Sequence, residues 1–196
     1  MSENLDNLWE LLEIFRSSPC YKDVVWQIFG VMRAPTEMNE LLAESLDEFR
    51  AKLPAFFHKY TMIRSRTYES ILSNISQVKE FREALLKISN GDLNAEQGFM
   101  TLRGIPGAGV FVSSTILNIA FEGKFIVFSD GVWDGFQELF PSMSERIEKP
   151  YNYKSYYEFQ QMCNAIADVY GIDSMAELHE FLWHGNDSEW NFYVEE

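Results

Sequence analysis

LRGIPGAGVFVSSTILNIAFEGKFIVFSD, residues 102–130, is the stretch that decides the fold. It opens with a glycine-rich turn from Gly104 to Gly109 and continues as a segment that is apolar on nearly all sides. It then ends in a short β-branched and aromatic run before an isolated acid, Asp130. A helix that is apolar all round belongs in the interior of a domain. We therefore expect the segment after Gly109 to form a central, buried helix.

The turn itself has the properties of an anion-binding loop. Gly107 and Gly109 lack a Cβ, so the backbone is free to adopt positive φ and to approach a ligand closely. The N–H groups near residues 107–111 then lie at a helix N-terminus, where unpaired donors and the helix dipole attract phosphate. An ordinary tight turn between two packed helices fits the same residues, and the physics of the turn alone leaves both alternatives open.

Apolar spacing in the rest of the chain is helical, and it predicts an all-α fold of about nine helices. We expect breaks where Pro35, Asn90-Gly91 and Gly171 interrupt the pattern, with Thr36 and Ser174 as N-caps of the helices that follow. Pro54 is expected to end or kink its helix. The apolar residues between positions 68 and 88 keep one helical spacing throughout and predict a single helix. Residues 125–128 fit a short strand, but the chain offers this strand no obvious partner.

The composition indicates a well-buried domain with an acidic surface. The 196 residues are 46% hydrophobic and 15% aromatic, and the net charge is −14. Residues 1–50 carry four basic and ten acidic groups, and residues 151–196 carry one basic and nine acidic groups. A general nucleic-acid binder is expected to be basic, so strong non-specific DNA affinity is disfavoured. The near-neutral middle leaves room for a local basic face, formed by Arg64, Arg66, Lys79, Lys87, Arg103 and Lys124.

Cysteine usage and hydropathy limit the other classes. Cys20 and Cys163 lie far apart, with no second cysteine at ligand spacing, so we expect two buried thiols and neither a structural zinc nor an iron–sulfur cluster. No apolar run reaches the roughly 18–20 residues of a membrane span. The acidic N-terminal segment lacks the basic start of a secretory signal. We therefore expect a cytoplasmic protein with no bound metal and no membrane partner.

The hairpin residues resemble a known motif. Leu102, Gly104, Ile105, Pro106, Gly107 and Gly109 are similar to the helix-hairpin-helix motif of the DNA glycosylase superfamily, which includes the endonuclease-three-like and adenine-specific mismatch enzymes. That family carries a catalytic Asp some twenty residues past the last hairpin glycine, and Asp130 follows Gly109 by 21 residues. Residues 176–185 also look like the closing helix of a little-characterised branch that has no iron–sulfur cluster. The resemblance implies an all-α fold of two helical lobes, with the hairpin and Asp130 at the cleft between them. The expected lobes are residues 34–129 and residues 1–33 with 130–196.

The resemblance also implies roles for individual residues. A glycosylase flips a modified or damaged base out of the duplex and hydrolyses its N-glycosidic bond. Asp130 is then the carboxylate that stabilises the oxocarbenium-like transition state or activates water. Phe111 stands where bifunctional members carry a Schiff-base lysine, which implies monofunctional chemistry. Hairpin carbonyls of this family hold a monovalent cation, and we expect no other cofactor. The residues expected to bind DNA are Gly104, Gly107, Ala108, Gly109, Val110, Phe111, Arg64 and Arg66, and those that fit a base pocket are Phe125, Phe128 and Trp133.

Several alternatives remain beside this interpretation. The hairpin also suits a non-catalytic module that binds DNA or, through the acidic terminal lobe, another protein. Asp130 also suits an N-cap of the helix that begins near Val132. Phe125, Phe128 and Trp133 fit a hydrophobic core better than a base pocket. An all-α protein with a fortuitous glycine turn is the third interpretation. The surroundings of Asp130, an open pocket or a helix cap, distinguish catalysis from the others.

Overall fold

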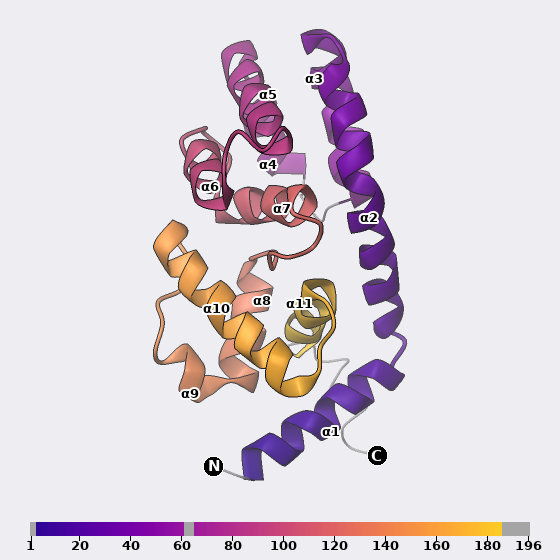
Figure 1. Ribbon diagram of the computed structural model, residues 1–196, viewed down its shortest axis with the longest axis vertical. Helices are drawn as coiled ribbons and strands as arrows, with labels where there is room; N and C mark the ends of the chain where they lie inside the picture. Colours follow the sequence, from indigo (N-terminus) through magenta and orange to yellow (C-terminus); the bar gives the residue numbers. More distant parts are fainter. Residues whose placement is uncertain (1–2, 61–64, 186–196) are drawn as a thin grey trace. The chain divides into compact units, whose positions relative to one another are not determined.

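The computed structural model describes residues 3–60 and 65–185, and all regular secondary structure in these ranges is helical (Figure 1). The expected all-α class is confirmed. The chain forms two compact units, residues 29–125 and residues 1–28 with 126–196. The sequence predicts boundaries after residues 33 and 129, whereas the boundaries in the structure come four to five residues earlier, after residues 28 and 125. Among the described residues, no helix combines the length and the low polarity that a bilayer crossing requires.

The unit of residues 29–125 is built around one buried helix. It contains most of α2 (Tyr21–Ala43), and then α3 (Leu46–Tyr60), α4 (Ser65–Leu72), α5 (Ile75–Ser89), α6 (Ala95–Arg103) and α7 (Val110–Ala120). Every residue of α7 from Val112 to Ile119 is buried, which confirms that the segment after Gly109 is a central helix. The hydroxyls of Ser114 and Thr115 donate to the carbonyl of Phe111, at 3.0 and 2.8 Å. These bonds let small polar side chains pack inside an apolar core.

The other unit combines both ends of the described chain. It contains α1 (Glu3–Ser17), the start of α2, α8 (Asp130–Leu139), α9 (Pro141–Ser144), α10 (Tyr153–Tyr170) and α11 (Met175–His184). Phe15, Phe136, Phe159 and Phe181 are fully buried in its core. Helices α8 and α11 pack closely, since a Cβ built on Gly135 would lie 1.7 Å from the carbonyl oxygen of Leu182. No residue other than glycine fits at position 135 without moving one of these helices.

The expected break at Pro35 is wrong, and Pro54 does not end its helix. Helix α2 continues through Pro35, and α3 continues through Pro54 to Tyr60, so Thr36 lies inside a helix and caps nothing. A proline in a helix interior costs about 3 kcal/mol. Beyond Pro35 the helix buries Met38, Leu41 and Leu42, and each such side chain contributes about 1.5–3 kcal/mol. Burial therefore outweighs the local preference for a break.

The single helix expected between residues 68 and 88 is also wrong, because two helices meet there. Helix α4 ends at Leu72 and α5 begins at Ile75, with Asn74 as its N-cap. The Asn74 side chain accepts a hydrogen bond from the amide of Ser76, at 2.8 Å. Asparagine side chains compete in this way with helical backbone bonds. The apolar spacing persists across the break because α4 and α5 both bury residues in the same core.

The remaining stop signals are confirmed. Helix α5 ends before Gly91, which has φ +77°, and α10 ends at Gly171, which has φ +61°. Both angles lie in the left-handed region that glycine adopts without strain. Ser174 caps α11 by accepting a hydrogen bond from the amide of Glu177, at 3.1 Å. These caps depend only on neighbouring residues, which is why the sequence pattern predicts them well.

No strand forms at residues 125–128 within the described part of the chain. The backbone of Ile126 instead pairs with two side chains of α10. Its amide donates to Gln160 Oε1 at 2.7 Å, and its carbonyl accepts from the Tyr156 hydroxyl at 2.8 Å. Both polar backbone groups of Ile126 are therefore satisfied without a neighbouring strand.

Candidate functional site

The glycine turn joins α6 to α7, and only one of its positions, 107, requires glycine. Gly107 has φ +90°, a conformation that side chains rarely adopt, and a Cβ there would lie 2.8 Å from Ser70 Oγ on α4. Glycine is therefore required at position 107 for conformation and for space. Gly109 has φ −67° and ψ −176°, so of the two glycines that are free to adopt positive φ, Gly107 does so and Gly109 does not. Its backbone is extended, as is usual for an N-cap.

The turn is held rigidly by local hydrogen bonds and by burial. The amide of Ile105 donates to the carbonyl of Leu102 at 2.9 Å, and the amide of Ala108 donates to the carbonyl of Ile105 at 3.0 Å. The side chains of Ile105 and Ala108 are buried in the core of residues 29–125. Gly104 ends α6 in the right-handed region. The backbone that precedes α7 is therefore fixed in one conformation.

Gly109 leaves the N-terminus of α7 accessible. It is the N-cap and has no side chain, and none of the described side chains caps this helix. A Cβ built at Gly109 would meet no described atom within 4 Å. Val110 and Phe111, the first residues of α7, are half-buried. The first-turn amides and the positive end of the helix dipole therefore lie beside open space, which suits an anion.

The basic residues expected near the hairpin are only partly described. Arg103 is exposed in the last turn of α6, and its guanidinium donates to the carbonyl of Ala108 at 3.4 Å. Lys79, Lys87 and Lys124 are exposed in the same unit. Arg64 and the side chain of Arg66 lie outside the part of the chain that the structure describes. Arg103 is thus the described cation that contacts the turn directly.

Asp130 lies at the start of α8 but is not its cap. Ser129 is the N-cap and accepts a hydrogen bond from the amide of Val132, at 3.2 Å. The Asp130 side chain is 83% exposed and forms an ion pair with Lys149 Nζ at 2.7 Å. The cap interpretation of Asp130 is therefore wrong, and an exposed carboxylate remains in the first turn of the helix. Asp130 and the hairpin belong to different units.

The three aromatic residues considered for a base pocket are packed against other rings. Phe128 and Trp133 are both only 5% exposed, and their rings lie 5.7 and 5.9 Å from the ring of Phe159. Phe125 is half-buried, with its ring 5.4 Å from that of Phe121. Phe128 and Trp133 thus occupy the interior of the unit of residues 1–28 and 126–196, which corresponds to the core role.

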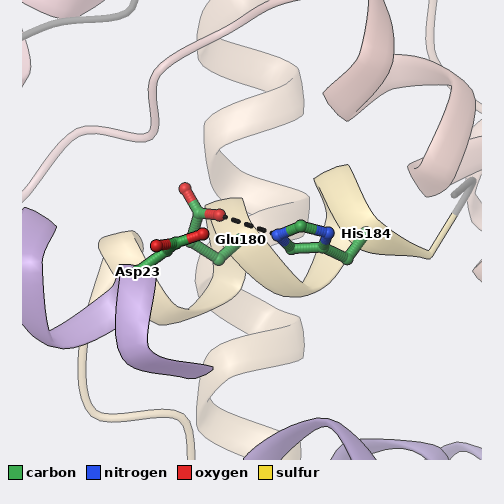
Figure 2. A group of neighbouring side chains, drawn as sticks. All are labelled: Asp23, Glu180 and His184. Carbon is green, nitrogen blue, oxygen red and sulfur yellow. Dashed lines mark ion pairs between the residues drawn. The ribbon is translucent and has the colours of Figure 1, made fainter. Parts of the chain in front are cut away.

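A cluster of carboxylate and imidazole side chains that the sequence pattern does not predict lies between α2 and α11. Asp23, Glu180 and His184 each place one possible ligand atom within 4.8 Å of the other two (Figure 2). Glu180 is 1% exposed, and its Oε2 lies 3.3 Å from His184 Nε2. Its other oxygen, Oε1, accepts a hydrogen bond from the Gln27 amide and lies 3.2 Å from His179 Nδ1. We refer to Asp23, Glu180 and His184 as the α2–α11 cluster.

Burial and the neighbouring histidines shift the pKa of Glu180 in opposite directions. Burial raises the pKa of this carboxyl group, but hydrogen bonds to His179 and His184 and the charges of these residues lower it more, to about 2. Glu180 is therefore ionised at neutral pH although it is buried. One signal in the sequence indicates part of the cluster, since Glu180 and His184 are four residues apart and share a helix face. Nothing links them to Asp23, which is 157 residues away from Glu180.

The comparisons with known proteins add no relative. No protein-family model, no curated protein and no solved structure matches this chain.

Proposed function

We propose that this protein binds the phosphate backbone of DNA through the helix-hairpin-helix turn at residues 104–109. The observation that carries the proposal is the N-terminus of α7, where Gly109 provides no side-chain cap and leaves open space in front of the first-turn amides. Amide donors and the helix dipole together favour a phosphate at such a position. The resemblance of the turn to glycosylase hairpins supports DNA as the source of that phosphate.

The charge of the protein sets the expected strength of this binding. With a net charge of −14, the protein as a whole repels a polyanion, so affinity must come from the hairpin and a few nearby cations such as Arg103. Each neutralised phosphate contributes about −0.9 to the slope of log affinity against log salt for duplex DNA. One or two contacts predict a slope between about −1 and −2, which is much shallower than that of a basic DNA-binding domain.

A substitution at Gly109 tests the anchor without damaging the fold. Asp is a favourable N-cap, its Cβ has space, and its carboxylate would occupy the first-turn amides and repel phosphate. We expect Gly109→Asp to keep or raise the thermal stability and to weaken binding to a fluorescent duplex at least tenfold. Gly109→Ala is the matched control, because its Cβ has the same space and it cannot occupy the amides, so it should bind the duplex as tightly as the wild type. If Gly109→Asp binds DNA as tightly as the wild type, the hairpin is not the anchor.

A second candidate function, hydrolysis of an N-glycosidic bond, follows from Asp130. Since Ser129 caps α8, the exposed Asp130 is not needed for that purpose. It also stands at the spacing after Gly109 that glycosylases use for their catalytic carboxylate. In this role Asp130 stabilises positive charge that develops on the sugar or takes a proton from the attacking water. Phe111 leaves no lysine at the Schiff-base position, so we propose monofunctional hydrolysis.

Base release from modified duplexes tests this second candidate. Single-turnover assays with duplexes that carry deaminated, alkylated, oxidised or mismatched bases should show release by the wild type and at least a hundredfold loss in Asp130→Asn. Asp134→Asn, an exposed acid on the same helix, is the control and should retain full activity. If the wild type releases no base, or if Asp130→Asn remains fully active, Asp130 is not a catalyst. The binding proposal stands or falls separately, on the Gly109 variants.

A further inference from the structure

The α2–α11 cluster has the composition and spacing of a metal site. Its members come from the two ends of the described chain, Asp23 from the first turn of α2 and Glu180 and His184 from α11. All three belong to the unit of residues 1–28 and 126–196, whereas the hairpin residues belong to the unit of residues 29–125. We propose that Asp23, Glu180 and His184 bind one divalent transition-metal ion, with zinc as the best match. This inference is independent of DNA binding.

The distances within the cluster fit a tetrahedral ion. Zinc binds imidazole nitrogen and carboxylate oxygen at about 2.0–2.2 Å, so two ligand atoms of one tetrahedral ion lie about 3.3–3.5 Å apart. Glu180 Oε2 and His184 Nε2 are 3.3 Å apart, which matches that edge. All three ligand atoms lie within 4.8 Å of one another, so the Asp23 carboxylate needs to approach by at most about 1.5 Å. Asp23 is exposed, and a change of rotamer supplies such a movement.

Neighbouring side chains already orient the central ligand. Gln27 donates to Oε1 of Glu180, and His179 Nδ1 lies 3.2 Å from the same oxygen. These contacts fix the carboxylate plane and direct Oε2 toward His184, as drawn in Figure 2. Hydrogen bonds of this kind to ligating carboxylates are a regular feature of protein metal sites. His179 also stacks on the ring of Trp183 at a centroid distance of 6.1 Å, which limits its movement.

The donor set selects the class of metal. Two carboxylates contribute two negative charges, and Glu180 is buried, so a divalent cation offsets an electrostatic cost that water does not relieve there. Calcium and magnesium prefer sites made only of oxygen ligands, whereas an imidazole nitrogen suits zinc and its neighbours in the first transition row. Three protein ligands leave a fourth position for water. The exposed Asp23 lies on the solvent side of the cluster and provides a route of entry.

Metal binding is expected to join α2 to α11. The ion would connect residues that are 157 and 161 positions apart in the chain, so it should stabilise the folded state according to its affinity. Tag-free protein is first stripped with a chelator and then titrated with zinc chloride by calorimetry. We expect one ion per chain and a melting temperature that rises with zinc concentration. Cobalt(II) should give the visible absorption of a four-coordinate site.

Four single variants test the ligands. Asp23→Asn and His184→Gln should each weaken zinc binding at least tenfold, and Asp23→Asn is the safer variant because this side chain is exposed. The controls are Asp168→Asn, an exposed acid on α10, and His58→Gln, an exposed histidine on α3, and both should bind zinc as the wild type does. Absence of saturable one-to-one binding would overturn the proposal. So would binding that survives both ligand variants, or that is lost in His58→Gln, because it would show that zinc binds elsewhere.

Discussion

Because α8 and α11 are in close contact, we expect Gly135→Ala to destabilise the protein strongly. The added Cβ would lie 1.7 Å from the carbonyl oxygen of Leu182, and real Cβ atoms essentially never approach within 3.0 Å of such an atom. The added Cβ is fixed to the backbone of α8 and the atoms that it would meet are backbone atoms of α11, so no side-chain rotation can relieve the overlap. The two helices must therefore separate by about 1.3 Å or more, which is enough to forfeit a quarter to a half of the dispersion energy between facing atoms.

The size of the effect follows from what this interface buries. Val132, Trp133 and Phe136 of α8 and Leu178, Phe181 and Leu182 of α11 are all buried. Overpacking in a core costs typically 1–3 kcal/mol, and a backbone obstacle places Gly135→Ala at or above the upper end, about 3 kcal/mol. For a chain of this length, each kcal/mol lowers the melting temperature by roughly 2–4 °C. We expect a decrease of about 6–12 °C in thermal unfolding followed by circular dichroism.

Two other glycines provide graded controls. A Cβ at Gly131, also in α8, would lie 3.1 Å from the ring of Trp183, which can yield by a few tenths of an ångström, so Gly131→Ala should cost less than about 1 kcal/mol. A Cβ at Gly30 in α2 would lie in ordinary contact, 3.6 Å from the ring of Tyr60. Gly30→Ala should therefore stabilise the protein by about 0.5–1 kcal/mol. If Gly135→Ala melted within 2 °C of the wild type, the described packing of α8 on α11 would be refuted.

Three further changes test other parts of the fold. Glu180 has a folded pKa of about 2 against an ordinary 4.5, so its charge stabilises the metal-free protein fully above pH 4.5 and progressively less as the pH falls toward 2. In urea unfolding, the free energy of unfolding of the wild type should exceed that of Glu180→Gln by at most about 3 kcal/mol at pH 6. This difference should shrink steadily toward pH 3, and a difference that stays constant with pH would contradict the expectation. Tyr156→Phe leaves the buried carbonyl of Ile126 without its hydroxyl donor and should cost about 1–2 kcal/mol in the same assay, whereas Tyr157→Phe, half exposed on α10, should cost little. Asn94→Ala removes the capping box of α6 and should cost about 1 kcal/mol, and Asn94→Asp, which can still cap, should recover most of it.

The helical class and the central helix were predictable because they depend on local patterns. Apolar residues on every side of residues 112–119 indicate burial whatever the neighbours are. Gly171 and Ser174 act through the backbone within four residues of themselves. The continuation of the helices through Pro35 and Pro54 has the opposite origin. There the burial of distant residues against other helices outweighed a local penalty, and a pattern in one segment carries no information on that burial.

The candidate sites divide in the same way. The turn between α6 and α7 was predictable because its residues are contiguous and its glycine spacing is unusual. The role of Ser129 as the cap of α8 was missed, since Ser129 and Asp130 are both good cap residues and differ in position by one. The α2–α11 cluster was out of reach because Asp23 meets Glu180 and His184 only after the chain has folded. The spacing of neighbouring residues reveals only Glu180 and His184, two of the three residues of the cluster.

The unit that combines both ends of the chain also has a consequence for how the protein is made. Helix α1 leaves the ribosome well before α10 and α11, yet Arg16 bonds to Glu177 across a separation of 161 residues, and the ring of Phe15 packs against that of Phe181. The buried face of α1 therefore emerges long before its partners exist. Residues 29–125 can form their own core in the meantime and so shorten the flexible chain that must close. A stalled nascent chain that has residues 1–125 outside the ribosome should hold a folded unit of residues 29–125 and an α1 that remains available to chaperones.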